Sequence, residues 1–82
     1  MSISGKNCLI TGANSGLGLA VSKQFAKMGA NTILLCRNKE HGENAVLEIK
    51  KETPDAALDL MICDLASMQS IQSFIHDFKG KY

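Results

Sequence analysis

The stretch that decides the fold is residues 7–18, Asn7-Cys8-Leu9-Ile10-Thr11-Gly12-Ala13-Asn14-Ser15-Gly16-Leu17-Gly18. It reads as a short apolar strand over 8–11, a glycine-rich turn and the start of a helix. The first N–H groups of a helix have no partner within it, and the helix dipole places partial positive charge there. This order therefore predicts a turn that can bind a phosphate group.

Three glycines in this stretch are expected to have separate tasks. Gly12 permits a tight turn directly after the strand, and Gly16 lets the backbone approach a bulky ligand. Gly18 lets the helix pack closely on the neighbouring strand. The alternative is a strand–helix turn that binds nothing, but a second strand ending near residue 36 is at the right distance for a ribose contact and favours the phosphate site.

Strand and helix alternate along the rest of the chain. Further elements are expected at residues 17–28, 32–36, 40–52, 58–63 and 68–79. The helices follow from apolar residues at helical spacing, and the second strand is almost continuously apolar, as a strand buried on both faces should be. Gly29 and Gly80 are expected to end the first and third helices, and Ser67 to cap the third.

The faces of two helices can be assigned from the same periodicity. Lys23 and Lys27 lie off the apolar stripe of the first helix and are expected to be solvated. The third helix is expected to place one apolar face against the protein, made of Met68, Ile71, Ile75 and Phe78.

The order β-α-β-α-β-α predicts an α/β fold, the N-terminal half of a Rossmann fold with a doubly wound parallel sheet and strands in the order 3-2-1. Residues 1–82 are expected to form one NAD(P)-binding Rossmann domain of this kind. In the complete fold the strand over 8–11 would have a further neighbour, and without one it is an exposed apolar edge. We therefore expect the chain to be the N-terminal fragment of a longer protein.

Composition excludes several classes of function. The 82 residues carry nine Lys and Arg against eight Asp and Glu, a net charge of +1, which gives no electrostatic case for a nucleic-acid partner. No apolar run reaches the roughly 18 residues of a membrane segment, and residues 1–7 lack the pattern of a signal peptide. The chain is therefore expected to be cytoplasmic.

The cysteines are odd in number and widely spaced, at Cys8, Cys36 and Cys63. Without a C-x-x-C pair they indicate neither a zinc site nor a disulfide framework, and no metal is expected. We expect small buried thiols, with Cys36 nearest to the ligand cleft.

Three motifs in order resemble the short-chain dehydrogenase/reductase family, and most closely its retinol-dehydrogenase-like members: residues 11–18, Cys36-Arg37-Asn38 and Asp64-Leu65. The resemblance implies an oxidoreductase that passes hydride between a nicotinamide dinucleotide and an alcohol or carbonyl substrate. The expected cofactor-binding residues are Gly12, Asn14, Ser15, Gly16, Leu17, Gly18, Arg37, Asp64 and Leu65.

These residues have different expected roles. Backbone N–H groups of the glycine turn and of Leu17 would reach the cofactor phosphates, although Asn14 or Ser15 could equally cap the first helix. The resemblance implies that the Asp64 side chain and the Leu65 backbone contact the adenine ring. The alternative for Asp64 is turn formation just before a helix.

Arg37 decides the expected cofactor. Folds that prefer NAD carry an acidic residue at the end of the second strand, whereas an arginine nearby accommodates the 2′-phosphate of NADP. A guanidinium suits this role because its planar fork can donate two hydrogen bonds to phosphate oxygens. The sequence thus favours NADP over NAD. Asn38 and Lys39 could support the phosphate or be ordinary loop residues.

The family's catalytic Tyr-x-x-x-Lys pair and its Asn-Asn-Ala-Gly segment do not occur in these residues. No catalytic residue is assigned, and enzyme activity is expected only of the full-length protein. The alternative is a non-catalytic nucleotide-binding or interaction fragment. A methyltransferase also uses a glycine-rich turn after a strand, but it fits less well, because an acidic residue rather than Arg37 would be expected at the ribose. A P-loop phosphohydrolase is excluded by the missing Gly-Lys-Ser/Thr. The sequence does not identify which alcohol or carbonyl compound is the substrate, and it leaves open whether the protein forms a homo-oligomer.

Overall fold

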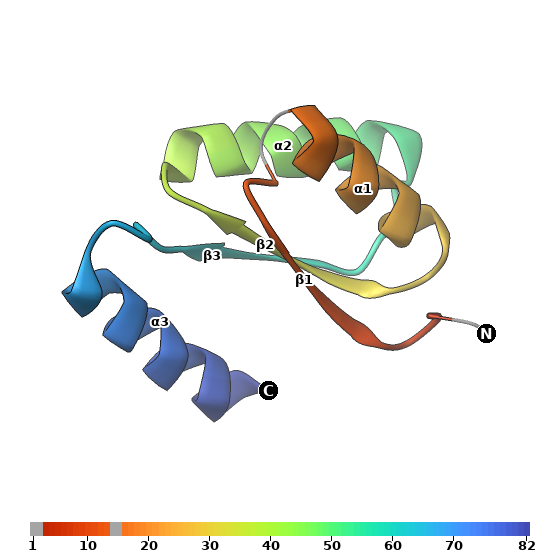
Figure 1. The fold of residues 1–82 in the computed structure, drawn as a ribbon. Helices are drawn as coiled ribbons and strands as arrows, with labels where there is room; N and C mark the ends of the chain where they lie inside the picture. The colour runs from red at the N-terminus through yellow and green to blue at the C-terminus, as the bar shows by residue number, and fades with distance from the viewer. Residues whose placement is uncertain (1–2, 14–15) are drawn as a thin grey trace.

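The computed structural model describes residues 3–13 and 16–82. Strands and helices alternate along these residues (Figure 1), in the order β1 (Asn7–Thr11), α1 (Gly16–Lys27), β2 (Asn31–Cys36), α2 (Lys39–Glu52), β3 (Leu58–Ile62) and α3 (Met68–Lys81). The order predicted from the sequence is confirmed, and every element end lies within one residue of its predicted position except the end of α3, which lies two residues later.

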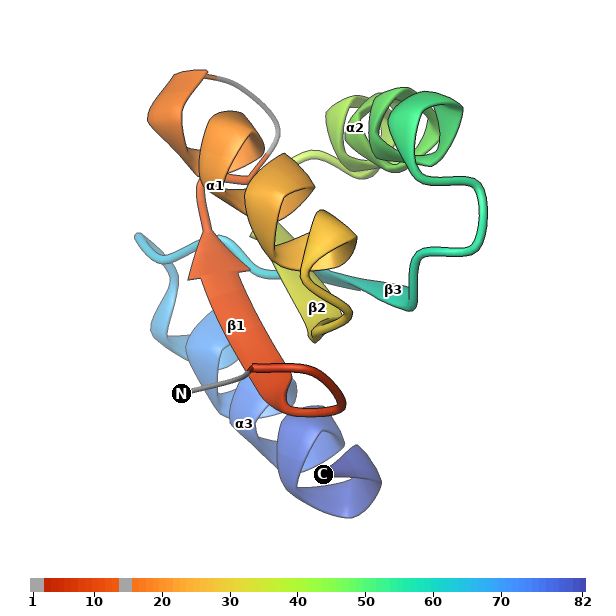
Figure 2. The ribbon, with the colours of Figure 1, turned by 90° about the vertical axis from the view of Figure 1, so that its right-hand side faces the viewer.

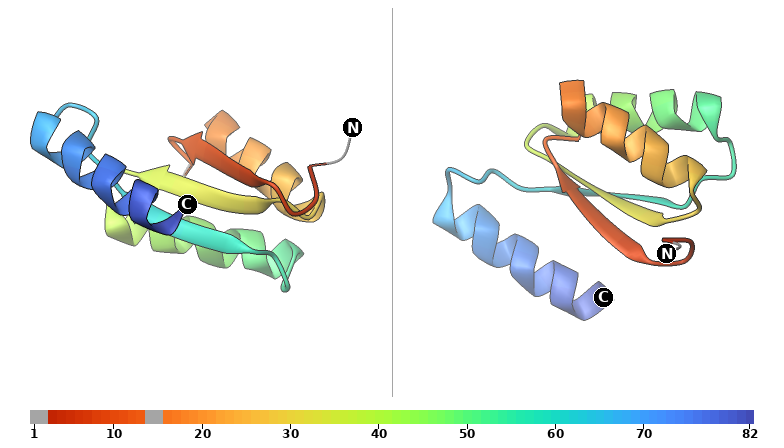
Figure 3. Two further views of the ribbon diagram at one scale, coloured as in Figure 1. Left: turned by 90° about the horizontal axis from the view of Figure 1, so that it is seen from below. Right: turned by 45° about the vertical axis from the view of Figure 1, so that its right-hand side comes forward.

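The strands form one parallel sheet in the order β1-β2-β3, the predicted arrangement. Helices α1 and α2 cover one face of this sheet, and α3 lies against the other (Figures 2 and 3). Residues 32–36 of β2 are consequently buried throughout. Parallel neighbours joined by helical crossovers require this layered arrangement, with the carboxyl ends of all three strands at one edge.

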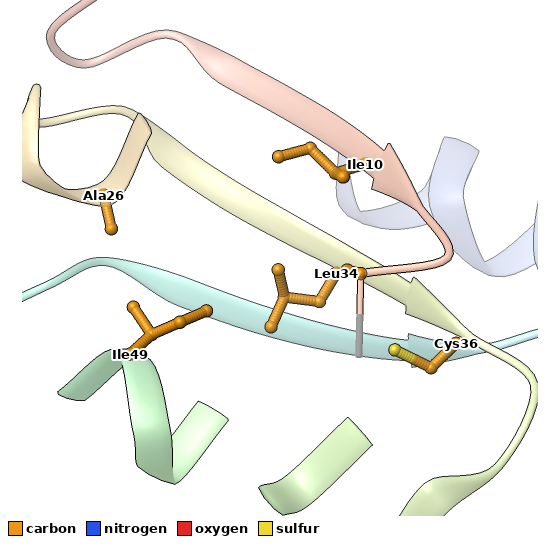
Figure 4. Packing of buried hydrophobic residues seen from close by; sticks show 6 residues of the cluster. Ile10, Ala26, Leu34, Cys36 and Ile49 are labelled. Carbon is orange, nitrogen blue, oxygen red and sulfur yellow. The ribbon is translucent and has the colours of Figure 1, made fainter. Parts of the chain in front are cut away.

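The core lies between the sheet and the pair α1 and α2. Ile10 of β1 pairs in register with Leu34 of β2, which in turn pairs with Leu60 of β3, so one row of side chains faces the helices. Ile49 of α2 and Ala26 of α1 pack onto this row (Figure 4). Burial of this row fixes which face of each strand points inward.

Side-chain caps fix where α2 and α3 begin. The Asn38 side chain accepts a hydrogen bond from the His41 N–H at 3.1 Å. Ser67 caps α3 as predicted, because its hydroxyl accepts from the Ser70 N–H at 3.2 Å. Each cap satisfies an N–H that the helix itself leaves without a partner.

The expected helix ends are confirmed for α1 and wrong for α3. Gly29 follows α1 with φ +84°, the left-handed conformation predicted for it. Gly80 does not end α3, since the helix continues to Lys81 and the Tyr82 N–H donates to the Phe78 carbonyl at 2.8 Å. The Phe78 and Tyr82 rings, 5.0 Å apart between centroids, accompany this last turn.

Helices α1 and α2 are joined by ion pairs. Lys23 Nζ lies 3.1 Å from Glu48 Oε1 and 3.0 Å from Glu52 Oε2, and Lys27 Nζ lies 3.3 Å from Glu52 Oε1. Hydrogen bonds to Glu52 and Glu48 raise the pKa of Lys23, and the bond from Lys23 lowers the pKa of Glu52. Lys27 is exposed, as expected, whereas the Lys23 side chain is only 25% exposed, because α1 and α2 lie side by side on one face of the sheet.

Helix α3 has apolar residues that are at most half-buried, among them Ile71, Phe74 and Phe78, and polar contacts at its carboxyl end. It has no buried residue, and Met68 of its expected apolar face is 68% exposed. At its carboxyl end, Lys81 Nζ lies 2.9 Å from Asp59 Oδ2 on β3, and the Tyr82 hydroxyl donates to the same oxygen. Burial alone would raise the pKa of Asp59, but the hydrogen bonds from Lys81 and Tyr82 outweigh it and lower that pKa.

In residues 3–13 and 16–82 no helix is both long and apolar enough to span a membrane. The cytoplasmic location and the assignment of 1–82 to a single NAD(P)-binding domain remain predictions.

The attachment of α3 should make stability sensitive to acid. Because the pKa of Asp59 lies below its ordinary value of 3.8, its contacts stabilise the fold above that value, and the stabilisation is lost as pH falls through the folded-state pKa. Urea unfolding of the chain between about pH 5 and about pH 2 should show a steeper loss than in Asp59→Asn. Asp55→Asn, at an exposed turn, is the matched control and should keep the steep loss. Equal acid slopes in the unmutated chain and Asp59→Asn would contradict this role.

Candidate functional site

A cleft of about 350 Å³ opens at the carboxyl ends of the three strands. Its lining residues are Thr11, Gly12, Leu35, Arg37, Cys63, Asp64, Leu65 and Ala66. In open parallel sheets ligands gather at this edge. Hollows of about 600 and 400 Å³ also flank α2, but they are lined by the outer surface of that helix and by β3 and include no part of the glycine turn.

The glycine turn needs glycine for its backbone. Gly12 has φ +60° and Gly16 has φ +58°, both in the left-handed region. A Cβ at either position would meet nothing within 4 Å, so the strain of a substitution comes from the backbone and the surface beside both residues is open. Asn14 and Ser15 lie outside the described residues. Leu17, in the first turn of α1, is 81% exposed.

Gly18 holds α1 against the turn. A Cβ there would lie 2.2 Å from the Gly12 carbonyl oxygen and 3.2 Å from the Ala13 Cα. We expected Gly18 to permit close packing on the strand, and the structure shows that its close neighbours are backbone atoms of the turn itself. The first turn of α1 can therefore lie directly over Gly12 and Ala13 only because position 18 has no side chain.

Arg37 and Asp64 meet across the cleft although they are far apart in sequence. Cys36 and Ile62 are partners in the parallel register of β2 and β3, so the residues that follow both strands emerge together. The Arg37 Nε lies 4.0 Å from Asp64 Oδ1, within ion-pair range but beyond hydrogen-bond length. The Arg37 side chain is 82% exposed, which leaves its guanidinium free to bind an anion.

Asp64 also forms the turn that precedes α3. Its Oδ1 accepts a hydrogen bond from the Ala66 N–H at 3.0 Å, and its carbonyl oxygen accepts from the Ser67 N–H at 2.9 Å. Asp64 therefore forms the turn that was the alternative prediction for this residue. Its side chain is nevertheless 40% exposed, beside the cleft. Leu65 lines the cleft beside it and is 60% exposed.

Some lining residues were not found from the sequence. Cys63, rather than Cys36, borders the cleft, because Cys36 points to the α2 side of the sheet, where Gly42 leaves room for it. Burial raises the pKa of the Cys36 thiol. The sequence did contain a signal for Cys63. Side chains alternate along a strand, which places Cys63 on the same face of the sheet as Met61, and this alternation could have identified Cys63 as a lining residue.

Asn38 and Lys39, the polar residues that follow Arg37, make contacts within α2. Asn38 caps α2, and Lys39 Nζ lies 3.9 Å from Glu43 Oε1, so both have local partners in α2. No cluster of three or more His, Cys, Asp or Glu side chains in the described part of the chain is placed to hold a metal ion.

Comparison with known proteins agrees with this geometry. The family model for short chain dehydrogenase matches residues 6–82. The WW domain-containing oxidoreductase of Gallus gallus is 48% identical over 79 residues, covering 96% of this chain and 19% of its own length. Retinol dehydrogenase 11 of Mus musculus is 39% identical over 74 residues, covering 90% of this chain and 23% of its own. The chain thus spans about a fifth of the length of these relatives.

Solved structures share the fold. L-sorbose reductase from Gluconobacter frateurii, complexed with NADPH and L-sorbose, superposes with a TM-score of 0.84 at 28% identity, over 99% of this chain and 30% of the reductase. The match to the family model covers almost the whole sequence, and the retinol dehydrogenase agrees with the resemblance seen in the motifs. The chain belongs to the short-chain dehydrogenase family.

Proposed function

We propose that this chain is the cofactor-binding part of an NADP(H)-dependent short-chain oxidoreductase that transfers hydride between NADP(H) and an alcohol or carbonyl compound. The observation that carries the proposal is the cleft in which the glycine turn, Arg37 and the Asp64 loop meet. Its relatives are about five times longer, so hydride transfer is proposed for the full-length protein that contains these residues. The residues described here bind and orient, and the nicotinamide supplies the redox chemistry when bound.

The glycine turn fits the pyrophosphate of a dinucleotide. Gly12 and Gly16 leave open surface where side chains would otherwise stand, and the Gly18 contact holds the start of α1 over this turn. Unpaired N–H groups at the start of a helix favour an anion. We propose that the N–H of Leu17 and those of Asn14 and Ser15 serve the phosphates in this way.

Arg37 fits the 2′-phosphate of NADP(H). Its guanidinium is exposed at the end of β2, and no hydrogen bond to Asp64 would have to break for it to bind a phosphate. The residues that follow Cys36 are Arg37, Asn38 and Lys39, so no carboxylate stands where NAD-preferring folds place one. The reductase that shares the fold is complexed with NADPH, which supports this choice.

Arg37→Asp should reverse the cofactor preference. In the full-length protein we expect tighter binding of NADPH than of NADH, and about a tenfold or greater loss of NADPH affinity in the variant, because a charge-assisted contact is replaced by repulsion. Fluorescence titration of both reduced cofactors measures the ratio. Lys6→Asp makes the same change of charge before β1, at the opposite end of the sheet, and should leave the ratio unchanged. Equal affinities for NADPH and NADH in the unmutated protein would refute the role of Arg37.

Gly18→Ala should weaken both cofactors alike. The added Cβ would overlap the Gly12 carbonyl oxygen, so the turn must shift away from the pyrophosphate that NADPH and NADH share. We expect both dissociation constants to rise by about tenfold or more, with their ratio unchanged. Gly80→Ala is the matched control in α3, where a Cβ meets nothing within 4 Å. Unchanged binding in Gly18→Ala would mean that the turn does not hold the phosphates.

Hydride transfer is tested in the full-length protein with a panel of aldehydes and ketones. Consumption of NADPH that depends on one of these compounds is the expected result. A protein that binds NADPH but reduces none of them, and oxidises no alcohol with NADP, would instead fit a non-catalytic nucleotide-binding module.

A further inference from the structure

Hydrogen bonds fix most peptide groups of the loop between β3 and α3. The Ala66 and Ser67 N–H groups both donate to oxygens of Asp64. The Asp64 N–H donates to the Ser70 hydroxyl at 2.8 Å. From Asp64 to Ser67, the Leu65 N–H is the one without a partner in the part of the chain that the structure describes. The loop therefore keeps a single free donor beside the Asp64 carboxylate.

Ser70 is the side chain of α3 that holds this loop. It stands in the first turn of α3, and its own N–H donates to the hydroxyl of the capping residue Ser67 at 3.2 Å. Its hydroxyl reaches beyond the cap to the Asp64 N–H, in a half-buried position. A capping box also pairs two residues three apart, but in a capping box the second side chain bonds to the backbone of the cap residue itself. In this protein the second side chain, Ser70, instead bonds to Asp64, which lines the cleft.

We infer that Ser70 is a positioning residue for the purine ring of the dinucleotide, an inference that rests on the proposed function. By accepting the Asp64 N–H, Ser70 occupies that donor and fixes the peptide that joins Cys63 to Asp64. The Asp64 side chain and the following peptide, whose carbonyl oxygen the Ser67 N–H holds, both extend from this fixed point. The Asp64 carboxylate can then accept from an exocyclic amine while the Leu65 N–H donates to a ring nitrogen.

This pattern of donor and acceptor discriminates between purines. Adenine presents an amine next to an acceptor nitrogen. Hypoxanthine presents a carbonyl oxygen in place of the amine, and this oxygen would face the Asp64 carboxylate without a proton between them. A site built to hydrogen-bond an amine rejects an analogue that lacks it, because its own polar group is then left unpaired. The selectivity depends on how firmly Ser70 holds the loop.

The test compares binding of NADPH and its deamino analogue, in which hypoxanthine replaces adenine, to the full-length protein. We expect Ser70→Ala to weaken NADPH binding about fivefold, the effect of one lost hydrogen bond, and to weaken the analogue less. The ratio of the two affinities should therefore fall. Ser70→Thr keeps the hydroxyl and should preserve the ratio. Ser73→Ala, at an exposed position on the same helix, should also leave the ratio unchanged.

Amide exchange without nucleotide gives a second readout. Ser70→Ala should speed exchange of the Asp64 N–H, whereas Ser73→Ala should not. If the unmutated protein binds NADPH and Ser70→Ala keeps the same ratio of affinities, the role of Ser70 is wrong and the proposed function stands. If the unmutated protein binds neither dinucleotide, the proposed function itself fails, and this inference fails with it.

Discussion

The parallel pairing of β1 and β3 on either side of β2 is the constraint on which the rest of the structure depends. It brings Thr11, Cys36 and Ile62, the last residues of the three strands, to one edge of the sheet. The cleft follows from this, because the glycine turn and Arg37 come directly after strand ends and Asp64 comes one residue later. The row from Ile10 through Leu34 to Leu60 keeps the pairing in register, since a slip by one residue would turn these side chains away from α1 and α2.

The elements and the outline of the site could be predicted because their signals are local. Hydrophobic period, the glycine spacing and capping residues such as Ser67 each act within a few residues, and they located the strands, the helices and the glycine turn. The Asp64-Leu65 pair was expected from the resemblance to the family. Contacts that depend on the packing of one element against another could not be predicted from these local signals. The lysines of α1 gained acidic partners from α2, Gly80 did not end α3, and the Ser70 hydroxyl bonds to Asp64 rather than to its own helix. None of these outcomes has a signal in the sequence around the residue concerned.

The closeness of Arg37 and Asp64 limits what the cleft can bind. A cation and a carboxylate 4.0 Å apart favour a ligand that offers a phosphate to one and a hydrogen-bond donor to the other. Asp64 Oδ1 already accepts from the Ala66 N–H, so the carboxylate is anchored in its own loop rather than by the arginine. An adenosine that carries a phosphate on its ribose meets both demands, which is why the two residues support the proposed cofactor together better than either does alone.

Helix α3 shows how an element outside the main core can still shape the site. It buries no residue completely, and apolar contact, which has no preferred direction, would by itself fix neither its rotation nor its register on the sheet. Its polar contacts are directional: Lys81 and Tyr82 reach Asp59 at one end, and Ser70 reaches Asp64 at the other. Because β3 carries Asp59 and leads through Cys63 to Asp64, the same strand sets both attachment points. The helix is thereby aligned along the strand that presents the cleft loop, and hydrogen bonds rather than buried area determine where that loop stands.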